Sequence, residues 1–434
     1  MNKTNAKIIA AEIEQAIKLK PEDFIKSNDL PKFCDELLDL PYGVGHIQNY
    51  IYGRMKYPSR ATAGIAALAA FGGFAMPFTT IESYGGLGLN EYFMVLAPTS
   101  FGKEDLRQSI KALFKKADSY SSPEEGGNLS FLKIPTVVFS APASPQALHQ
   151  MLQIQKHQFF MSDEFAEWLA QSKTNSFNQA TLAYFMEIYT SALGTVCVPQ
   201  SISGQYKNVE NPRVAIFSTS TAERMCEVMT QSHADSGAYN RWIIFAAEQS
   251  PIEKKYEGFN FDPTDNAVQA LLFLTSLGRK KVKFDPAAWD YFKTHDRGVI
   301  EPIRFVDVGL AGRLSEQAIK IAAILALSDK RLVIEKSDLM TAFTIRENLY
   351  YRSKRLLELR GAMSGEHETG RAAAQLRETF QRKESISFSR MSDYSRSFKK
   401  LSSREKQDVI KELLNEGVCE PDKRKGTYRS LLCN

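Results

Sequence analysis

A glycine and a lysine follow an apolar run in the stretch EYFMVLAPTSFGKEDLRQSI, residues 91–110. This order predicts a strand, a turn that ends in Gly102 and Lys103, and then a helix. Backbone N–H groups at such a turn can face a phosphate while the lysine reaches the terminal phosphates. The stretch therefore predicts a nucleotide site, with an ordinary strand-to-helix connection as the alternative. The residues predicted to surround the nucleotide are Pro98, Thr99, Ser100, Phe101, Gly102, Lys103, Glu104 and Asp105.

Two positions depart from the G-x-x-x-x-G-K-[ST] pattern of phosphate loops. Ala97 replaces the first glycine, which is a mild change because the side chain is small. Glu104 stands where a serine or threonine would hold Mg²⁺. Its carboxylate can coordinate the metal, but it also adds negative charge beside the phosphates, so we expect weak nucleotide affinity or an inactive site.

Two carboxylates follow the apolar run of HQFFMSDEFAEW, with Asp163 sixty residues after Lys103. The carboxyl end of a parallel strand is where ligands bind in this type of sheet. We predict that Asp163 holds Mg²⁺, directly or through water, and that Glu164 polarises the attacking water as a general base. A solvent-facing acidic pair at a strand end is the alternative.

Hydroxyl residues end a further apolar run, in ENPRVAIFSTSTAER. In an ATPase core, a polar side chain at this strand tip positions the lytic water between the γ-phosphate and the base. Ser218, Thr219 and Ser220 are the candidates, and Thr219 is favoured.

Two arginines complete the ordered series. Arg241 directly precedes the apolar run WIIFAA, and Arg313 opens the predicted helix RLSEQAIKIAAILAL. An arginine at a domain edge can enter a neighbouring subunit's site and stabilise the transition state of phosphoryl transfer. We predict this role for Arg241 and contact with a phosphate, from a helical lid, for Arg313. Surface salt bridges are the alternative for either arginine.

The elements that would position these residues belong to an α/β fold with a mainly parallel sheet, because strand-like and helix-like runs alternate. We predict strands at residues 92–96, 136–140, 158–162, 214–218 and 241–246, and a turn at Gly43 and Gly45. The predicted domains are a helical N-terminal region (1–75), an ATPase core (76–262), a helical lid (263–360), and a linker with a C-terminal domain (361–434).

Composition indicates an ordinary globular protein, with 43% hydrophobic and 24% charged residues among 434. No apolar run reaches the roughly 18 residues of a membrane span, and the N-terminus reads as a charged amphipathic helix rather than a secretory signal. The five cysteines lack C-x-x-C spacing. We therefore expect a cytoplasmic protein with free thiols and no membrane partner.

The C-terminal domain carries most of the basic excess, with 15 lysines and arginines against 11 acidic residues from Gly365 onward. Its pattern predicts three helices, the third with a capping box of Ser402 and Glu405, followed by a hairpin. This order predicts a winged helix, a type of domain that commonly touches nucleic acid or a protein neighbour. The cations at the hairpin tip are Lys423, Arg424 and Lys425.

The whole series resembles the AAA+ helicases of the minichromosome-maintenance type, and more closely their small relatives encoded by phages, plasmids and genomic islands beside primases. In those families a phosphate loop and an Asp-Glu strand precede a polar sensor, an arginine ahead of an apolar strand (here AYNRWIIF), an arginine opening a lid helix (here GRLSEQAIKIA) and a winged helix. The resemblance covers roughly residues 40–434.

The resemblance implies a P-loop NTPase core of the AAA+ type, with ATP and Mg²⁺ as cofactors. Lys103 would bind the β- and γ-phosphates, Thr219 or its neighbours would form the first sensor, Arg241 would be the arginine finger and Arg313 the second sensor. In that family the segment after the Asp-Glu strand forms a hairpin that grips DNA. The corresponding run here is LGTVCVPQSISGQYKNV, whose single cation is Lys207.

Three functions follow as expectations. The first is a ring-forming ATPase, a hexamer, that moves on single-stranded DNA as the replicative helicase of a mobile element, with a primase or initiator as a further partner. The second is a nucleotide-dependent initiator, loader or switch that binds ATP and assembles on DNA without unwinding it. The third is a DNA-binding protein with a degenerate phosphate loop. The AAA+ and RecA-like strand orders both stay open, and the helix opened by Arg313 favours AAA+.

Overall fold

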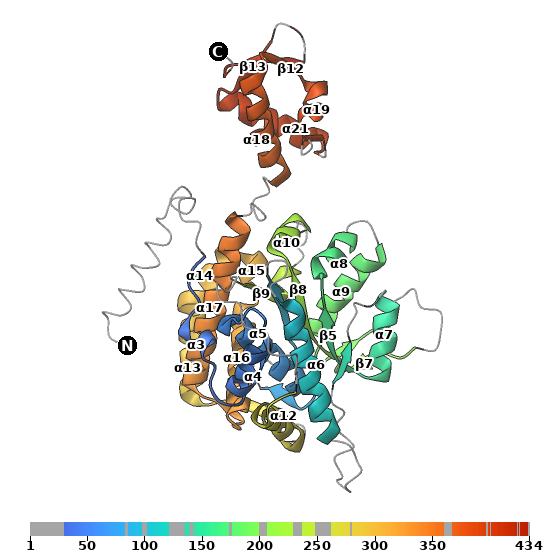
Figure 1. The fold of residues 1–434 in the computed structure, drawn as a ribbon, viewed down its shortest axis with the longest axis vertical. Helices are drawn as coiled ribbons and strands as arrows, with labels where there is room; N and C mark the ends of the chain where they lie inside the picture. Colours follow the sequence, from blue (N-terminus) through green and yellow to red (C-terminus); the bar gives the residue numbers. More distant parts are fainter. Residues whose placement is uncertain are drawn as a thin grey trace, which may run out of the picture. The chain divides into compact units, whose positions relative to one another are not determined.

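The structure is a computed structural model that describes most of the chain. The described residues are 30–82, 86–97, 102–120, 135–138, 142, 144–172, 176–198, 206–228, 237–247, 262–277, 280–359, 367–395, 398–399, 401–422, 424 and 426–432. The chain divides into two compact units, residues 1–356 and 357–434, which are described separately (Figure 1).

Five parallel strands form the central sheet of the first unit, in the order β4-β5-β8-β3-β9. Their bounds are β3 Tyr92–Leu96, β4 Thr136–Val138, β5 His157–Ser162, β8 Arg213–Ser220 and β9 Trp242–Ala246. Every residue of β3, β5, β8 and β9 is buried, as expected for a parallel sheet covered on both faces. The predicted α/β class with a mainly parallel sheet is therefore confirmed. Arg241 was wrongly placed in the last strand, because it ends the 3₁₀ turn η2 (Tyr239–Arg241).

Helices cover both faces of this sheet (Figure 1). On one face lie α5 (Arg60–Ala75) and α6 (Lys103–Tyr120), where the Phe114 ring stacks on Phe159 with centroids 5.2 Å apart. On the other lie α8 (Phe165–Ser172) and α9 (Ser176–Thr190), where Phe185 meets Phe160 edge-on at 5.5 Å. Successive strand residues point to opposite faces, so Phe159 and Phe160 anchor different layers.

The predicted turn at Gly43 and Gly45 is wrong, because both residues lie inside helix α4 (Tyr42–Arg54). Close packing explains their presence in a helix. A Cβ at Gly45 would lie 2.1 Å from the Leu40 carbonyl oxygen, and one at Gly43 would lie 3.0 Å from the Ser328 carbonyl oxygen. The glycines thus let α4 approach its neighbours closely.

The remainder of the first unit includes a second sheet that the sequence did not predict. Its order is β11-β10-β1-β2, and its strands come from two distant parts of the chain, residues 79–88 and 280–334. The bounds are β1 Thr79–Ile81, β2 Leu87–Gly88, β10 Lys280–Phe284 and β11 Val333–Ile334. The helices here are α3 Asp35–Leu38, α7 Pro145–Ile154, α10 Ala222–Val228, α12 Asp265–Leu277, α13 Pro286–His295, α14 Glu301–Val306, α15 Val308–Ala311, α16 Leu314–Ser328 and α17 Lys336–Leu359, with a π-helical turn, η3, at Asp296–Ile300.

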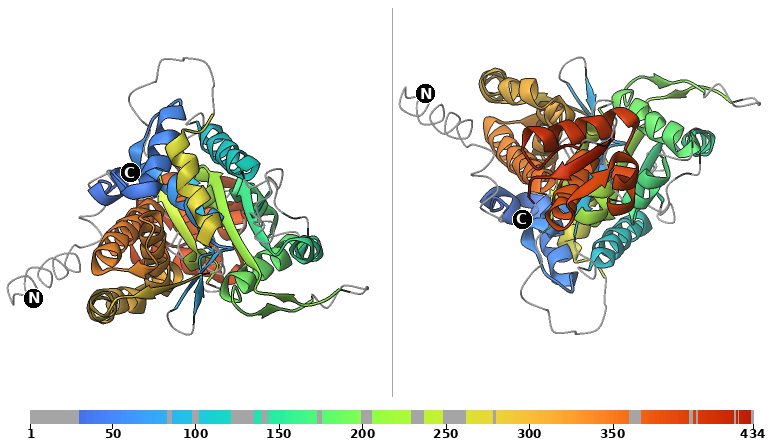
Figure 2. Two further views of the ribbon diagram at one scale, coloured as in Figure 1. Left: turned by 90° about the horizontal axis from the view of Figure 1, so that it is seen from below. Right: turned by 90° about the horizontal axis from the view of Figure 1, so that it is seen from above.

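A short antiparallel pair, β6 (Thr195–Val196) and β7 (Val209–Glu210), forms the base of a hairpin in the run predicted to grip DNA. Both views of Figure 2 show this green hairpin standing out from the body of the first unit. Among the helices of the described ranges, none is long and apolar enough to cross a membrane.

The second unit combines helices with a three-stranded antiparallel sheet of order β12-β14-β13. Its elements are α18 His367–Arg382, β12 Ser385–Ser387, η4 Phe388–Arg390, α19 Met391–Tyr394, α21 Ser403–Asn415, β13 Cys419–Pro421 and β14 Thr427–Ser430. The unit has its own apolar core, which includes Phe380, Phe398 and Leu413. The predicted capping box is confirmed: Ser402 and Glu405 each bond the other's backbone N–H.

Candidate functional site

Three strands bring Lys103, Asp163, Glu164 and Thr219 to one edge of the central sheet, the edge at which the parallel strands end. Lys103 begins α6 after β3, and Asp163 and Glu164 follow β5. Thr219 is the second-to-last residue of β8. β8 lies between β3 and β5 in the sheet. Thr219 therefore sits between the Gly-Lys turn and the acidic pair, at the carboxyl ends where ligands bind to such sheets.

Lys103 contacts the predicted general base directly. Its Nζ lies 3.4 Å from Glu164 Oε1. The Lys103 side chain is largely covered, and about half of the Glu164 side chain is exposed. Glu164 also has a φ of +48°, in the left-handed region that non-glycine residues rarely adopt. Strain of this kind concentrates at functional sites, so the backbone of Glu164 marks this edge independently of its charge.

Three groups hold the Asp163 carboxylate, and the first is the Glu164 backbone N–H, which donates to Oδ1 at 3.1 Å. Thr219 Oγ1 donates to Asp163 Oδ1 at 2.5 Å, and Arg107 Nη1 lies 3.2 Å from Asp163 Oδ2. The two other hydroxyl candidates do not make this contact: Ser218 Oγ donates to the Phe93 carbonyl oxygen, and Ser220 Oγ is buried without a hydrogen-bond partner among the described residues. Thr219 is thus the member of the hydroxyl series that contacts the acidic pair.

Arg107 is a site residue that the sequence analysis missed. The same Nη1 atom lies 3.1 Å from Glu104 Oε2, so one guanidinium bridges the two carboxylates predicted to hold Mg²⁺. Arg107 lies three residues after Glu104 and four after Lys103, a spacing that places the three on one face of α6. That spacing was the available signal.

The convergence of two carboxylates on one cationic group also fits a divalent cation. Mg²⁺ in nucleotide sites takes one or two carboxylates together with phosphate oxygens and water, and Glu104 and Asp163 supply the carboxylates. Within the described part of the chain, no group of three or more His, Cys, Asp or Glu side chains could hold a metal on protein ligands alone. A metal here would therefore depend on phosphate and water for its remaining ligands.

Asp105 lies in the first turn of α6, directly after the predicted phosphate turn. Its Oδ2 accepts a hydrogen bond from the Lys56 backbone N–H at 2.7 Å, and burial raises the pKa of this carboxyl group. Gly102 has a φ of +84°, and a Cβ there would lie 2.8 Å from Asp105 Oδ2. Asp105 therefore ties the first turn of α6 to the backbone that follows α4. Pro98, Thr99, Ser100 and Phe101 lie outside the described residues.

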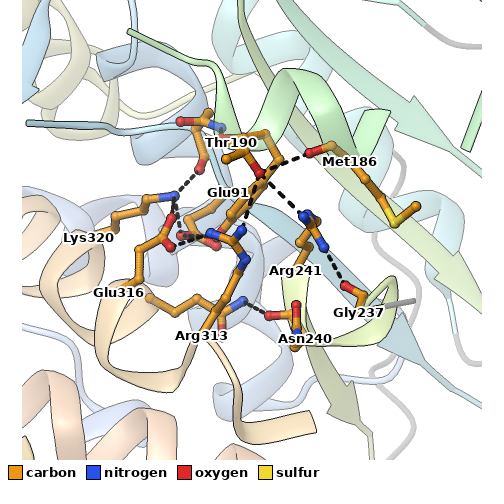
Figure 3. A network of polar contacts seen from close by, with 12 residues as sticks. Glu91, Met186, Thr190, Gly237, Asn240, Arg241, Arg313, Glu316 and Lys320 are labelled. Carbon is orange, nitrogen blue, oxygen red and sulfur yellow. Dashed lines mark hydrogen bonds and ion pairs between the residues drawn. The ribbon is translucent and has the colours of Figure 1, made fainter. Parts of the chain in front are cut away.

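Arg241 and Arg313 lie close together (Figure 3), at the opposite edge of the sheet, where the parallel strands begin. Both donate to the hydroxyl oxygen of Thr190, at 3.3 Å from Arg241 Nη2 and 3.2 Å from Arg313 Nη2. Tyr92 pairs with Trp242, so Arg241 lies level with the amino end of β3, whereas Lys103 follows its carboxyl end. At about 3.3 Å per residue, β3 alone separates the two levels by roughly 13 Å. Within one chain, the arginines and Lys103 form two distinct clusters.

A buried ionic network supports the arginine cluster (Figure 3). Lys320, 1% exposed, places Nζ 3.1 Å from Glu91 Oε1 and 3.0 Å from Glu316 Oε1, and 4.0 Å from the centre of the Tyr189 ring. Burial raises the pKa of Glu91. Glu316 Oε2 in turn accepts a bond from Arg313 Nη1 at 2.5 Å. The network thereby fixes the position of the Arg313 guanidinium.

The two guanidinium groups retain capacity for an anion. Burial lowers the pKa of Arg241, and the neighbouring positive charge of Arg313 lowers it further. Arg241 Nη1 donates to the Gly237 carbonyl oxygen at 2.6 Å, and its Nε is buried without a hydrogen-bond partner among the described residues. Two close positive charges with one adjacent carboxylate, Glu316, form an electropositive spot that suits a phosphate.

The predicted DNA contacts that the structure describes, Lys207 and Arg424, belong to other elements of the chain than these clusters. Lys207 is exposed beside β7, and its backbone oxygen accepts hydrogen bonds from His149 Nε2 and Gln153 Nε2 of α7. Arg424 is exposed between β13 and β14. Lys423 and Lys425 lie outside the described residues.

Together, the fold and these clusters define an α/β protein with a parallel central sheet and charged clusters at both edges of it. No protein-family model matches the chain, and comparison with curated proteins finds no similar sequence.

Proposed function

We propose that this chain is a ring-forming ATPase of the AAA+ type that acts as a DNA helicase or translocase in the replication of a mobile element. Its first unit would be the P-loop NTPase core with its helical lid, and its second unit the winged helix. The proposal rests mainly on two contacts at one edge of the sheet, Lys103 with Glu164 and Thr219 with Asp163. The paired residues lie at, or just after, the ends of three separate strands. They are far apart in the sequence, so the fold brings them together.

The geometry supports a distinct role for each residue. Lys103 would leave Glu164 for the terminal phosphates of ATP, since a lysine at a helix start behind a glycine turn is suited to bind them. Glu164 would then accept the proton of the attacking water. Thr219, hydrogen-bonded to Asp163, would hold the carboxylate in place and orient the water. Glu104 and Asp163 would hold Mg²⁺, which neutralises phosphate charge when bound.

The separation of the two clusters supports assembly. Arg241 and Arg313 share Thr190 at the amino end of the strands, away from Lys103 in the same chain. In a head-to-tail ring, the arginine edge of one subunit meets the nucleotide edge of the next, where the two guanidinium groups would stabilise the charge of the transferring phosphoryl group. We propose a hexamer on the strength of the resemblance to AAA+ helicases.

Two features support DNA as the partner. The β6–β7 hairpin stands out from the first unit (Figure 2). Exposed Lys207 lies two residues before β7. The second unit combines helices with an antiparallel hairpin that carries Arg424, the arrangement expected of a winged helix. Contact through phosphates would be independent of sequence and strongly dependent on salt. A primase or an initiator would be a further partner.

One observation favours a second function, a nucleotide-dependent switch without unwinding. Arg107 forms ion pairs with both carboxylates predicted to bind Mg²⁺, those of Glu104 and Asp163. Glu104 would also add negative charge beside the phosphates. Both features work against tight binding of Mg²⁺ and ATP. A chain of this kind would assemble on DNA with ATP bound and turn it over slowly.

ATP hydrolysis with and without single-stranded DNA tests the proposal. The helicase function predicts turnover that DNA stimulates and that Lys103→Ala, Glu164→Gln and Arg241→Ala each abolish. Binding of ATP without turnover would support the switch function. Absence of ATP binding in the wild type would refute both.

A further inference from the structure

Three large apolar side chains project into solvent at the junction of α14 and α15. Phe305 is 88% exposed, Val306 is 80% exposed and Val308 is 63% exposed. Single exposed apolar residues are common on protein surfaces, but a cluster marks an interaction site. We infer that this segment, the 305–308 surface, is where a second copy of this chain docks.

The segment is held rigidly although its apolar side chains are exposed. Asp307, between the valines, accepts the Leu310 N–H at 3.1 Å through Oδ1 and the Tyr350 hydroxyl of α17 at 3.0 Å through Oδ2. On the preceding turn, Arg304 Nη2 donates to Asp296 Oδ1 at 2.8 Å and to Ser315 Oγ at 3.0 Å. A preorganised apolar surface loses little conformational entropy when it is covered.

The 305–308 surface lies on a segment that contacts the residues preceding both arginines. Asn240, which precedes Arg241, donates through Nδ2 to the Val308 carbonyl oxygen at 3.4 Å. Gly312, which precedes Arg313, lies against the same amide, since a Cβ there would be 2.7 Å from Asn240 Nδ2. Both arginines are therefore tied, through adjacent residues, to the segment that exposes the apolar side chains.

Charge identifies the occupant as another copy of the chain. The arginine edge presents two guanidinium groups beside one carboxylate, Glu316, and is therefore positive on balance. The opposite edge presents the three partly exposed carboxylates of Glu104, Asp163 and Glu164 beside two cations, Lys103 and Arg107, and is negative on balance. One chain cannot bring its two edges together, but a head-to-tail contact between copies pairs them. This step rests on the proposed function in one respect, that the arginines serve a neighbour's nucleotide. Burial of the 305–308 surface would accompany that contact.

Sedimentation velocity of the full chain with ATP and Mg²⁺ tests the inference through a Phe305→Glu variant. The matched control is Ile154→Glu, because Ile154 on α7 is 83% exposed and belongs to neither edge cluster. We expect the wild type and the Ile154→Glu variant to assemble, and the Phe305→Glu variant to need at least tenfold higher protein concentration. Thermal unfolding of both variants should match that of the wild type, since both side chains lie in solvent.

Assembly is measured without turnover, so the inference and the proposed function can fail separately. Assembly that needs Phe305 in a chain that hydrolyses no ATP would keep the docking surface and refute the ATPase. Equal assembly of the wild type and Phe305→Glu would overturn the inference. A monomeric wild type that Phe305→Glu destabilises would also overturn it, and would assign the surface to residues 1–29 of the same chain, whose sequence predicts an apolar helix face.

Discussion

Arg241 and Arg313 donate to one hydroxyl oxygen, that of Thr190, although 72 residues separate them in the sequence. Two positive charges so close together repel each other, and burial of Arg241 adds to the cost. Glu316 offsets part of this charge through its bond to Arg313, and a further anion would offset the rest. The proposed anion is the terminal phosphate of a nucleotide on the neighbouring subunit.

Replacement of Thr219 by valine should separate catalysis from binding. The change keeps the shape of the side chain but removes the hydrogen bond to Asp163 Oδ1. We expect kcat for ATP to fall about 100-fold, as for the loss of a positioned donor, with nucleotide affinity nearly unchanged. Steady-state hydrolysis and calorimetric binding measure the two quantities.

Two controls accompany this variant. Thr219→Ser keeps the hydroxyl group and should retain most of the activity. Ser218→Ala removes only a bond to the Phe93 carbonyl oxygen and should cost about 1 kcal/mol of stability without a specific effect on kcat. A similar loss of kcat in Thr219→Val and Ser218→Ala would contradict the assigned role of Thr219.

Glu104→Thr restores the hydroxyl group that phosphate loops carry at this position. It removes one negative charge near the phosphates and one carboxylate from Arg107. Repulsion of about 1 kcal/mol in a solvated site corresponds to roughly fivefold in affinity, so ATP with Mg²⁺ should bind about five times more tightly. Titration calorimetry with and without Mg²⁺ checks this. Weaker binding in the presence of Mg²⁺, but not in its absence, would instead identify Glu104 as a metal ligand.

The stability of the arginine cluster should depend on pH through Glu316. Burial would raise the pKa of this carboxyl group, but Lys320 and Arg313 outweigh it and hold the pKa below its ordinary value. An acid with a lowered pKa in the folded state stabilises the fold above its unfolded pKa of about 4.5, and this contribution is lost as the pH falls through the folded pKa.

Glu316→Gln should therefore destabilise the chain at pH 7, by about 3 kcal/mol, because Lys320 stays buried with one carboxylate fewer. The difference from the wild type should shrink below pH 4.5. Urea denaturation at pH 7 and pH 4 measures both values. An equal difference at the two pH values would exclude the ionised Glu316 as its source.

The hairpin tip of the second unit offers a test of DNA contact. Lys423→Glu, Arg424→Glu and Lys425→Glu together should weaken DNA binding and lower the slope of log affinity against log salt by up to about 3. Lys411→Glu on α21 is the control with the same kind of charge reversal, because Lys411 is exposed, as Arg424 is. Unchanged affinity and salt slope in the triple variant would show that the tip lies away from DNA.

The parallel sheet could be predicted from the sequence because its strands are apolar runs with clear ends. Asp163 and Thr219 were placed at one edge by the rule that parallel strands share their carboxyl ends, and their hydrogen bond agrees with that placement. The second sheet could not be predicted. Thr79 pairs with Lys280 across two hundred residues, and β10, KKVKF, exposes lysines instead of an apolar run.

The partners of individual side chains also lay beyond the sequence. Arg107 had the spacing to join Lys103, but its contact with Asp163 depends on how α6 packs beside β5. Arg241 and Arg313 lie close together because η2 packs against α15 and because both arginines donate to Thr190 of α9. Contacts of this kind come from tertiary packing, which local periodicity does not report.

In the proposed ring, Lys103 of one subunit works with Arg241 of the next. The most direct test mixes the inactive variants Lys103→Ala and Arg241→Ala and measures ATP hydrolysis of the mixture under conditions of assembly. A mixed ring contains interfaces in which an Arg241→Ala subunit supplies an intact Lys103 and a Lys103→Ala subunit supplies an intact Arg241. We predict that the mixture recovers activity that neither variant has alone, at most a quarter of the wild-type rate for random mixing at equal amounts. A mixture that assembles and stays as inactive as its components would contradict it.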